Sequence, residues 1–149
     1  MKKKLFSLFV LIVLLSSAYA ANSEGIGKIK TLNGQVTIER SDTTYPAELG
    51  GIVFQGDIII SGQDGAVGLL FDDDSRVALG PNSSLVLDNF VFNQKTQEGN
   101  FDVSLKTGTL SAISGKLTER KPGAMKVRTP AAILAVRGTE LSVKVDAPK

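Results

Sequence analysis

Apolar and polar residues alternate with a period of two over much of the chain beyond residue 25. The runs 35–39, 66–71, 102–106 and 141–146 each have apolar side chains at every second position. Successive side chains of a strand point to opposite faces, so each run predicts a strand with one buried and one solvent-facing side. No stretch beyond the first 20 residues shows the 3.6-residue apolar period of an amphipathic helix.

Short turn elements separate these runs, at Asn33-Gly34, 63–65, 72–75, 80–82, Thr107-Gly108 and Pro122-Gly123. Asn33-Gly34 and Thr107-Gly108 have the composition of two-residue hairpin turns. The mixed segment 41–51 and the polar segment 93–100 are predicted loops. Short strands with turns at this spacing predict an all-β domain, a compact two-layer sandwich or a β-roll or solenoid-like domain of about ten short strands.

The first 20 residues have the features of a signal peptide. Lys2, Lys3 and Lys4 precede the apolar run 5–15, and Ala18-Tyr19-Ala20 supplies the small residues that a signal peptidase accepts. We expect cleavage between Ala20 and Ala21. A retained membrane anchor is the alternative, but a span needs about 20 apolar residues. The predicted product is periplasmic or secreted, has no integral membrane segment, and folds as one domain over residues 26–146.

Removing the signal peptide changes the charge balance. The full chain carries 17 Lys and Arg against 15 Asp and Glu, a net charge of +2. Three of the lysines and no acidic residue lie in residues 1–20, so the rest carries 14 against 15 and a net charge of −1. Nucleic-acid binders need a basic patch or stripe, and only a small basic cluster flanks Pro122-Gly123. We therefore expect no nucleic-acid partner.

The composition also lacks the residues that carry most enzyme chemistry. There is no His and no Cys, which removes the usual general base near neutral pH, thiol nucleophiles and the common zinc sites. Lys106-Thr107-Gly108 spells one motif of penicillin-binding enzymes, but no serine has a lysine three positions later to complete the set. We expect a protein that is not an enzyme and needs no cofactor.

Three adjacent carboxylates, Asp72, Asp73 and Asp74, form the most concentrated charge in the sequence. Carboxylate oxygens are the ligands that calcium prefers, yet neighbours in a tight turn rarely converge on one ion. The favoured interpretation is an acidic turn whose Asp side chains accept backbone N–H groups. Calcium binding remains the weaker alternative.

Two further features have both a structural and a binding interpretation. Arg137 follows the apolar run 131–136, so its stem is expected to be buried, with Asp57 as its ion-pair partner; a ligand-binding arginine is the alternative. Phe90, Phe92 and Phe101 are expected in the core, although exported β domains also place aromatic residues on binding edges.

Four short motifs resemble those of the FecR-like domain, a periplasmic module named after an iron-citrate sensor of bacterial envelopes. In order and spacing they match over roughly residues 34–145. The matching residues are Gly56, Asp57 and Gly62, then Asp73 and Ser75, then Gly80, Pro81, Asn82 and Ser83, and finally Thr129, Pro130, Arg137, Gly138 and Thr139. Asp74 stands where the family usually has Gly, which suggests a different turn or a left-handed Asp. Ala135 replaces a frequent Gly.

The named family member also has a cytoplasmic segment and a transmembrane helix ahead of this domain. We expect this chain to have neither once its signal peptide is cleaved, so the resemblance implies a stand-alone exported module. The implied function is a non-enzymatic interaction module of the envelope with an unknown protein partner, which could be the sensory part of a signalling pathway. The alternative is a small-ligand or glycan-binding protein. An unprotected edge strand would favour the first, and a deep apolar pocket with convergent polar groups would favour the second.

Overall fold

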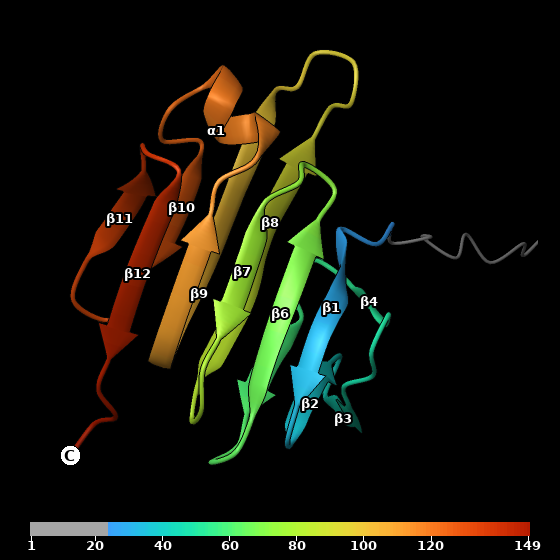
Figure 1. Cartoon of the computed structure of the whole chain (residues 1–149), viewed down its shortest axis with the longest axis vertical. Coiled ribbons are helices and arrows are strands. Elements are labelled where there is room, and N and C mark those ends of the chain that lie inside the picture. Colours follow the sequence, from blue (N-terminus) through green and yellow to red (C-terminus); the bar gives the residue numbers. More distant parts are fainter. Residues whose placement is uncertain (1–23) are drawn as a thin grey trace, which may run out of the picture.

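The computed structural model describes residues 24–149 of the chain (Figure 1). The predicted signal peptide and its cleavage site lie outside the described residues. Strands dominate the fold, in the order β1 (Gly27–Asn33), β2 (Val36–Arg40), β3 (Thr43–Pro46), β4 (Ile52–Val53), β5 (Ile58–Ser61), β6 (Ala66–Phe71), β7 (Arg76–Leu79), β8 (Ser84–Phe92), β9 (Gly99–Ile113), β10 (Met125–Arg128), β11 (Ile133–Val136) and β12 (Glu140–Val145), with one helix, α1 (Lys116–Arg120). The all-β prediction is confirmed, with twelve strands within residues 24–149 where about ten were expected.

The strands form one curled sheet that folds into two layers. The front layer has the order β4-β1-β6-β7-β9-β12. The back layer has the order β3-β2-β5-β8-β9-β10-β11. Neighbours are antiparallel except β9 and β10, which run parallel. β9 belongs to both layers, because its first half pairs with β8 and its second half with β7 and β12.

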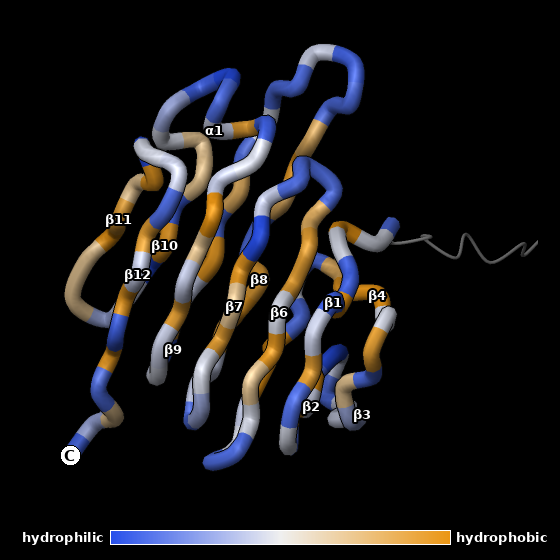
Figure 2. The backbone as a smooth tube through the Cα atoms, viewed as in Figure 1, coloured by the Kyte–Doolittle hydropathy of each residue, from blue (hydrophilic) through white to orange (hydrophobic). Residues whose placement is uncertain are grey.

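The core lies between the two layers and is built from the predicted alternation. Val67, Leu69 and Phe71 of β6 all point inward and are 2% exposed, while their neighbours along the strand are half-buried. Phe71 packs against Phe101 and Phe90, with ring centroids 4.5 and 5.8 Å away. The structure thus places Phe90 and Phe101 in the core. Apolar residues concentrate in the strands and polar residues in the connecting loops (Figure 2).

Two predicted hairpins are instead crossings from one layer to the other. Asn33-Gly34 joins β1 to β2, which do not pair with each other: β1 pairs with β4 and β6, and β2 with β3 and β5. Thr107-Gly108 lies inside β9, at the corner where this strand changes layers. Gly108 has φ +94° there, a left-handed value that favours glycine. The hairpin prediction is therefore wrong at both places: Thr107-Gly108 lies within one strand, and Asn33-Gly34 joins strands of different layers.

Two elements were not predicted. The segment 41–51 contains β3, which pairs with β2 through a two-residue turn. Ser41 and Asp42 form this turn with φ 49° and 62°, the left-handed pair that a type I′ hairpin requires. The helix α1 has five residues, too few for an apolar period. Within residues 24–149 no helix has the length and apolar character needed to cross a membrane.

Candidate functional site

Asp57 lies fully buried directly before β5, where its carboxylate binds Arg40 of β2. The Arg40 Nε and Nη2 groups each donate a 2.7 Å hydrogen bond to one of the two carboxylate oxygens, the bidentate geometry that makes such pairs strong. This hydrogen bond raises the pKa of Arg40 above its ordinary value. The Phe54 N–H also donates to Asp57, at 2.9 Å, and closes the turn in which Gly56 has φ +89°. Asp57 is therefore a structural residue that joins β2 to the turn before β5.

The predicted pair between Arg137 and Asp57 is wrong. Arg137 is exposed and makes no ion pair within residues 24–149. The apolar run that precedes it forms β11, which pairs only with β10 among the described strands. Ile133 of this edge strand is 60% exposed. An apolar run on an edge does not bury the residue that follows it, so the arginine reaches solvent.

The motif residues Gly62, Gly80, Pro81, Asn82 and Ser83 lie where the chain crosses between the layers. The buried Ser61 hydroxyl donates to the Gly80 carbonyl at 2.6 Å and accepts the Ser83 N–H at 2.9 Å. The Asn82 N–H donates to the Gly62 carbonyl at 3.0 Å. Two crossings, β5 to β6 and β7 to β8, are thereby bonded to each other, and these motif residues are structural.

The three carboxylates of the acidic turn differ in burial and in the partners they bind. Asp73 is fully buried, and its oxygens accept the Ser75 N–H at 3.0 Å and the Ser75 hydroxyl at 2.6 Å. This confirms the turn interpretation for Asp73. Asp74 has φ +67°, the left-handed conformation suggested by the sequence, and forms a 2.8 Å ion pair with Lys116, which raises the pKa of that lysine.

The third carboxylate, Asp72, is exposed and forms no ion pair within 4 Å in the part of the chain that is described. Its side chain reaches solvent, but the surrounding protein removes part of the hydration of its carboxylate and so raises its pKa, which the negative charges of Glu24 and Asp73 raise further. Across residues 24–149 no three His, Cys, Asp or Glu side chains gather as metal ligands would.

The C-terminal motif residues shape the connections around β11. The Thr129 hydroxyl accepts the N–H groups of Ala131 and Ala132 at 3.3 and 3.0 Å, which caps the turn that contains Pro130. The Gly138 carbonyl accepts the Ser114 hydroxyl at 2.9 Å. The Thr139 carbonyl accepts the Ser114 N–H, also at 2.9 Å. This second connection carries the chain from β11 in the back layer to β12 in the front layer.

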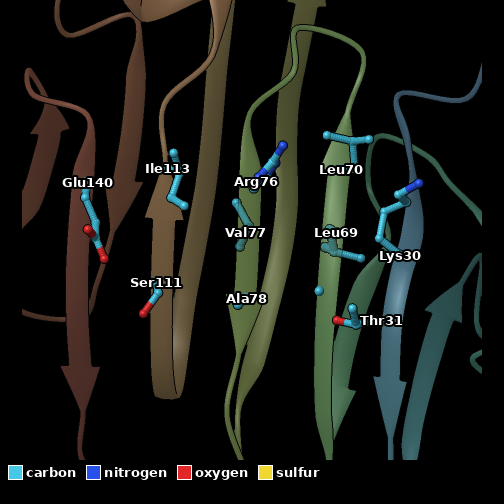
Figure 3. Close-up of a pocket in the computed structure, with 11 residues that line it drawn as sticks. Lys30, Thr31, Leu69, Leu70, Arg76, Val77, Ala78, Ser111, Ile113 and Glu140 are labelled. Atoms are coloured by element: carbon cyan, nitrogen blue, oxygen red, sulfur yellow. The ribbon is translucent and has the colours of Figure 1, made fainter.

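A hollow of about 400 Å³ lies on the outer face of the front layer (Figure 3). Its floor is a row of small residues in register across four strands, Thr31, Gly68, Ala78 and Ser111. Beside this row runs a second one of larger residues, Leu70, Arg76, Ile113 and Glu140. The hollow lies outside the two layers rather than between them and has no aromatic side chain in its lining.

The two layers do not end together at the C-terminal side of the molecule. The crossings join β1 to β2, β5 to β6 and β7 to β8 from one layer to the other, and β9 passes from the back layer to the front layer. Beyond β9 the front layer has one strand, β12, and the back layer has two, β10 and β11. Hence β11 has no described strand opposite it, and the outer edge of β12 is unpaired. We call this place, beside β12 and opposite β11, the step; it forms the left end of the molecule in Figure 1.

The side chains at the step are only partly covered. Leu141, Val143 and Leu134 face the interior but are half-buried, whereas Leu105 and Leu110 one strand further in are at most 1% exposed. β12 runs for six residues in unbroken register with β9 and contains no proline. The alternation had predicted this strand. Its edge position depends on strand pairing, for which the sequence carries no local signal.

The edges at the other end of the molecule are shorter. β4 has two residues and β3 has four, the last of them Pro46. Short edge strands and proline are common protections against the addition of another strand. With six residues, β12 is the longest of the strands that end either layer within the described part of the chain.

The fold and its sites define an all-β, two-layer protein whose motif residues mostly hold turns and crossings, and whose open features are the step and the outer hollow. A model of the family described as "FecR protein" matches residues 57–149, and the chain belongs to this family. A comparison with curated proteins finds no match. A solved structure described as "Cell surface anchoring domain" is 31% identical, covering 41% of this chain and 82% of its own, with a TM-score of 0.40.

Proposed function

We propose that this protein is an exported, non-enzymatic interaction module of the bacterial envelope that docks a protein partner at the step. Membership of the FecR family supports the envelope setting. The observation that carries the proposal is the edge of β12, six residues long and without proline or bulge. An unpaired edge of this kind presents backbone donors and acceptors to an incoming strand.

The non-enzymatic part of the proposal is supported by composition and by the roles of the motif residues. The chain has no His and no Cys. The buried carboxylates Asp57 and Asp73 are both engaged in hydrogen bonds that hold turns. If the protein has a sensory role, we propose that it acts by docking the partner at the step and that the partner passes the signal on.

The test uses the native host, in which the chain carries either Ser142→Pro or the matched control Ser142→Ala. Proline removes an N–H from the middle of β12, while alanine keeps the backbone unchanged. We expect envelope crosslinking to capture the same partner with the native chain and with S142A, and to lose it with S142P. Equal capture by all three chains would refute docking at the step.

The outer hollow supports a second candidate, a small-ligand or glycan binder, because about 400 Å³ is within the usual range of ligand sites. The absence of aromatic side chains from its lining argues against glycan stacking. A thermal-shift screen of envelope glycans and metabolites tests it. A ligand that stabilises the native protein but not Ala78→Arg, which would fill the floor of the hollow, would establish this function instead.

A further inference from the structure

The step indicates what kind of partner segment it can hold. We infer that it receives an extended segment of another protein, which pairs antiparallel with β12 as a seventh strand of the front layer. The inference rests on the proposed function, because it specifies the partner that docks at the step. It follows from the backbone groups, the side chains and the space that the step provides.

The backbone groups at the open edge follow from the pairing of β12 with β9. The Ser114 N–H donates to the Thr139 carbonyl, and hydrogen-bonded pairs alternate along an antiparallel ladder. Leu141 and Val143 therefore bond to β9, and the N–H and C=O groups of Glu140, Ser142 and Lys144 face outward. Ser142 and Ser111 therefore form a non-hydrogen-bonded pair, in which side chains lie closer together. Their hydroxyls are indeed 3.4 Å apart.

The side chains at the step would best accommodate a segment in which apolar and polar residues alternate. On the inner face, Leu141 and Val143 stand next to the open position, and Leu134 of β11 lies opposite it. Apolar residues at every second position of the segment would cover them. On the outer face, Glu140 and Lys144 require a basic and an acidic residue opposite them. Lys144 has one exposed partner, Asp146 at 3.7 Å, and such surface pairs are weak.

Written in the antiparallel direction, the required segment is acidic, apolar, neutral, apolar and basic. The chain itself contains this pattern in β12, as Glu140-Leu141-Ser142-Val143-Lys144. A peptide with the sequence of residues 139–146 would therefore place its Glu opposite Lys144 and its Lys opposite Glu140. Ser142 would face its own counterpart, and each apolar residue would face another. This peptide is a defined probe for the step.

A folded second copy does not fit the step as well as an extended segment. If β12 of another copy lay beside this β12, its own β10 and β11 would lie behind it. β11 of the first copy already occupies that space, because the back layer extends one strand past the front layer. A single strand meets no such obstacle and gains Leu134 as an apolar contact. We therefore assign the step to an extended segment.

The experiment titrates a fluorescent peptide of residues 139–146 with the exported protein purified from its host. We expect saturable binding to the native protein and to S142A, and a loss of at least about tenfold in affinity for S142P, because the central backbone donor is gone. Proline is tolerated where the N–H of an edge strand faces solvent. If S142P fails to fold, Leu134→Lys tests the same position from β11 and should weaken binding similarly.

Exchange of charges tests the register. A peptide with its Glu and Lys exchanged places like charges opposite both Glu140 and Lys144, and should bind the native protein more weakly, by up to about tenfold. The protein variant Glu140→Lys/Lys144→Glu should reverse this preference and bind the exchanged peptide better. A preference that stays the same in both proteins would overturn the antiparallel register.

The outcomes separate this inference from the proposed function. If the peptide does not bind, yet S142P loses the partner in the host, docking at the step stands and the extended antiparallel segment is refuted. If the purified native protein forms dimers that S142P abolishes, the occupant is a second copy and the inference is again refuted. If neither binding nor capture responds to S142P, both the inference and the proposed function fail.

Discussion

Arg40 binds both carboxylate oxygens of Asp57, and the two partners differ sharply in their access to water. The Arg40 side chain is 33% exposed and the Asp57 side chain is 0% exposed. The guanidinium also lies over the Phe54 ring, 4.3 Å from its centroid. The pair therefore connects a buried anion to the surface through a cation whose stem and face are packed.

This difference in exposure predicts an asymmetry between two substitutions. Arg40→Met leaves a buried carboxylate that keeps the hydrogen bond from the Phe54 N–H but has lost its cation, and should lower the free energy of unfolding by about 3–5 kcal/mol. Asp57→Asn removes the buried charge, and Arg40 can turn to solvent, so its loss should be about 1–3 kcal/mol. Urea unfolding of both variants measures this, with the exposed Arg128→Met as a control near zero. An equal or reversed order would contradict the account.

A second prediction compares two glycines. A Cβ on Gly115 would lie 2.2 Å from the Asp73 carbonyl oxygen and 2.4 Å from the Ser75 nitrogen, both backbone atoms of a buried turn. Gly115→Ala should therefore destabilise the protein by more than about 2 kcal/mol. Gly138 has no atom within 4 Å of such a Cβ, so Gly138→Ala should stay within about 0.5 kcal/mol. Thermal unfolding measures the loss of stability in the two variants. A similar loss in both would rule out close contact with the Cβ as the cause.

The sequence predicted the positions of the strands better than it predicted which strands pair with each other. The alternation of Val67, Leu69 and Phe71 is a local pattern, and it fixes both the strand and its buried face. Asn33-Gly34 is also a local signal, but it is the same for a hairpin and for a crossing between layers. Only the pairing of β1 with β6 and of β2 with β5, which are distant in the chain, distinguishes the two.

At the candidate sites, too, local sequence patterns identified residues but not the partners that they contact in the fold. Asp57 was singled out, but its partner Arg40 lies at the polar end of a strand where no pattern distinguished it. Arg137 looked buried because an apolar run precedes it, and a run does not reveal whether its strand is central or an edge. The mixed polarity of residues 41–51 predicts a loop, yet this segment contains the edge strand β3, whose last residue is Pro46, a residue that an edge strand tolerates. The step could not be predicted, because it requires the number of strands in each layer.

A third prediction tests the bond between the crossings. The buried Ser61 hydroxyl both donates to Gly80 and accepts from Ser83, so Ser61→Ala leaves a buried carbonyl and N–H without this partner. We expect a loss of about 1–3 kcal/mol in the free energy of unfolding. Ser84→Ala, at the half-buried serine that directly follows Ser83, is the matched control and should cost far less. Hydrogen exchange should also show faster exchange at the Ser83 amide in the Ser61 variant, and unchanged exchange there would contradict the bonded crossing.

The last prediction concerns pH and the unpartnered carboxylate of the acidic turn. Partial burial, then the charges of Glu24 and Asp73, raise the pKa of Asp72 above its ordinary value of 3.8. The folded state therefore holds this proton more tightly than the unfolded state does. The favourable contribution is complete below the unfolded pKa and is lost as the pH rises through the folded pKa. At neutral pH the charged form is a cost to the fold, which Asp72→Asn removes.

Asp72→Asn should thus have a higher Tm than the native protein at pH 7, and the difference should shrink as the pH falls toward 4 and the native carboxyl takes up its proton. Asp74→Asn is the matched control, because it removes the ion pair with Lys116 and should give no gain at pH 7. Glu24→Gln should reproduce part of the gain, since it removes one of the charges that act on Asp72. A lower Tm for Asp72→Asn at pH 7, or a gain that persists unchanged at pH 4, would show that the turn needs the Asp72 charge.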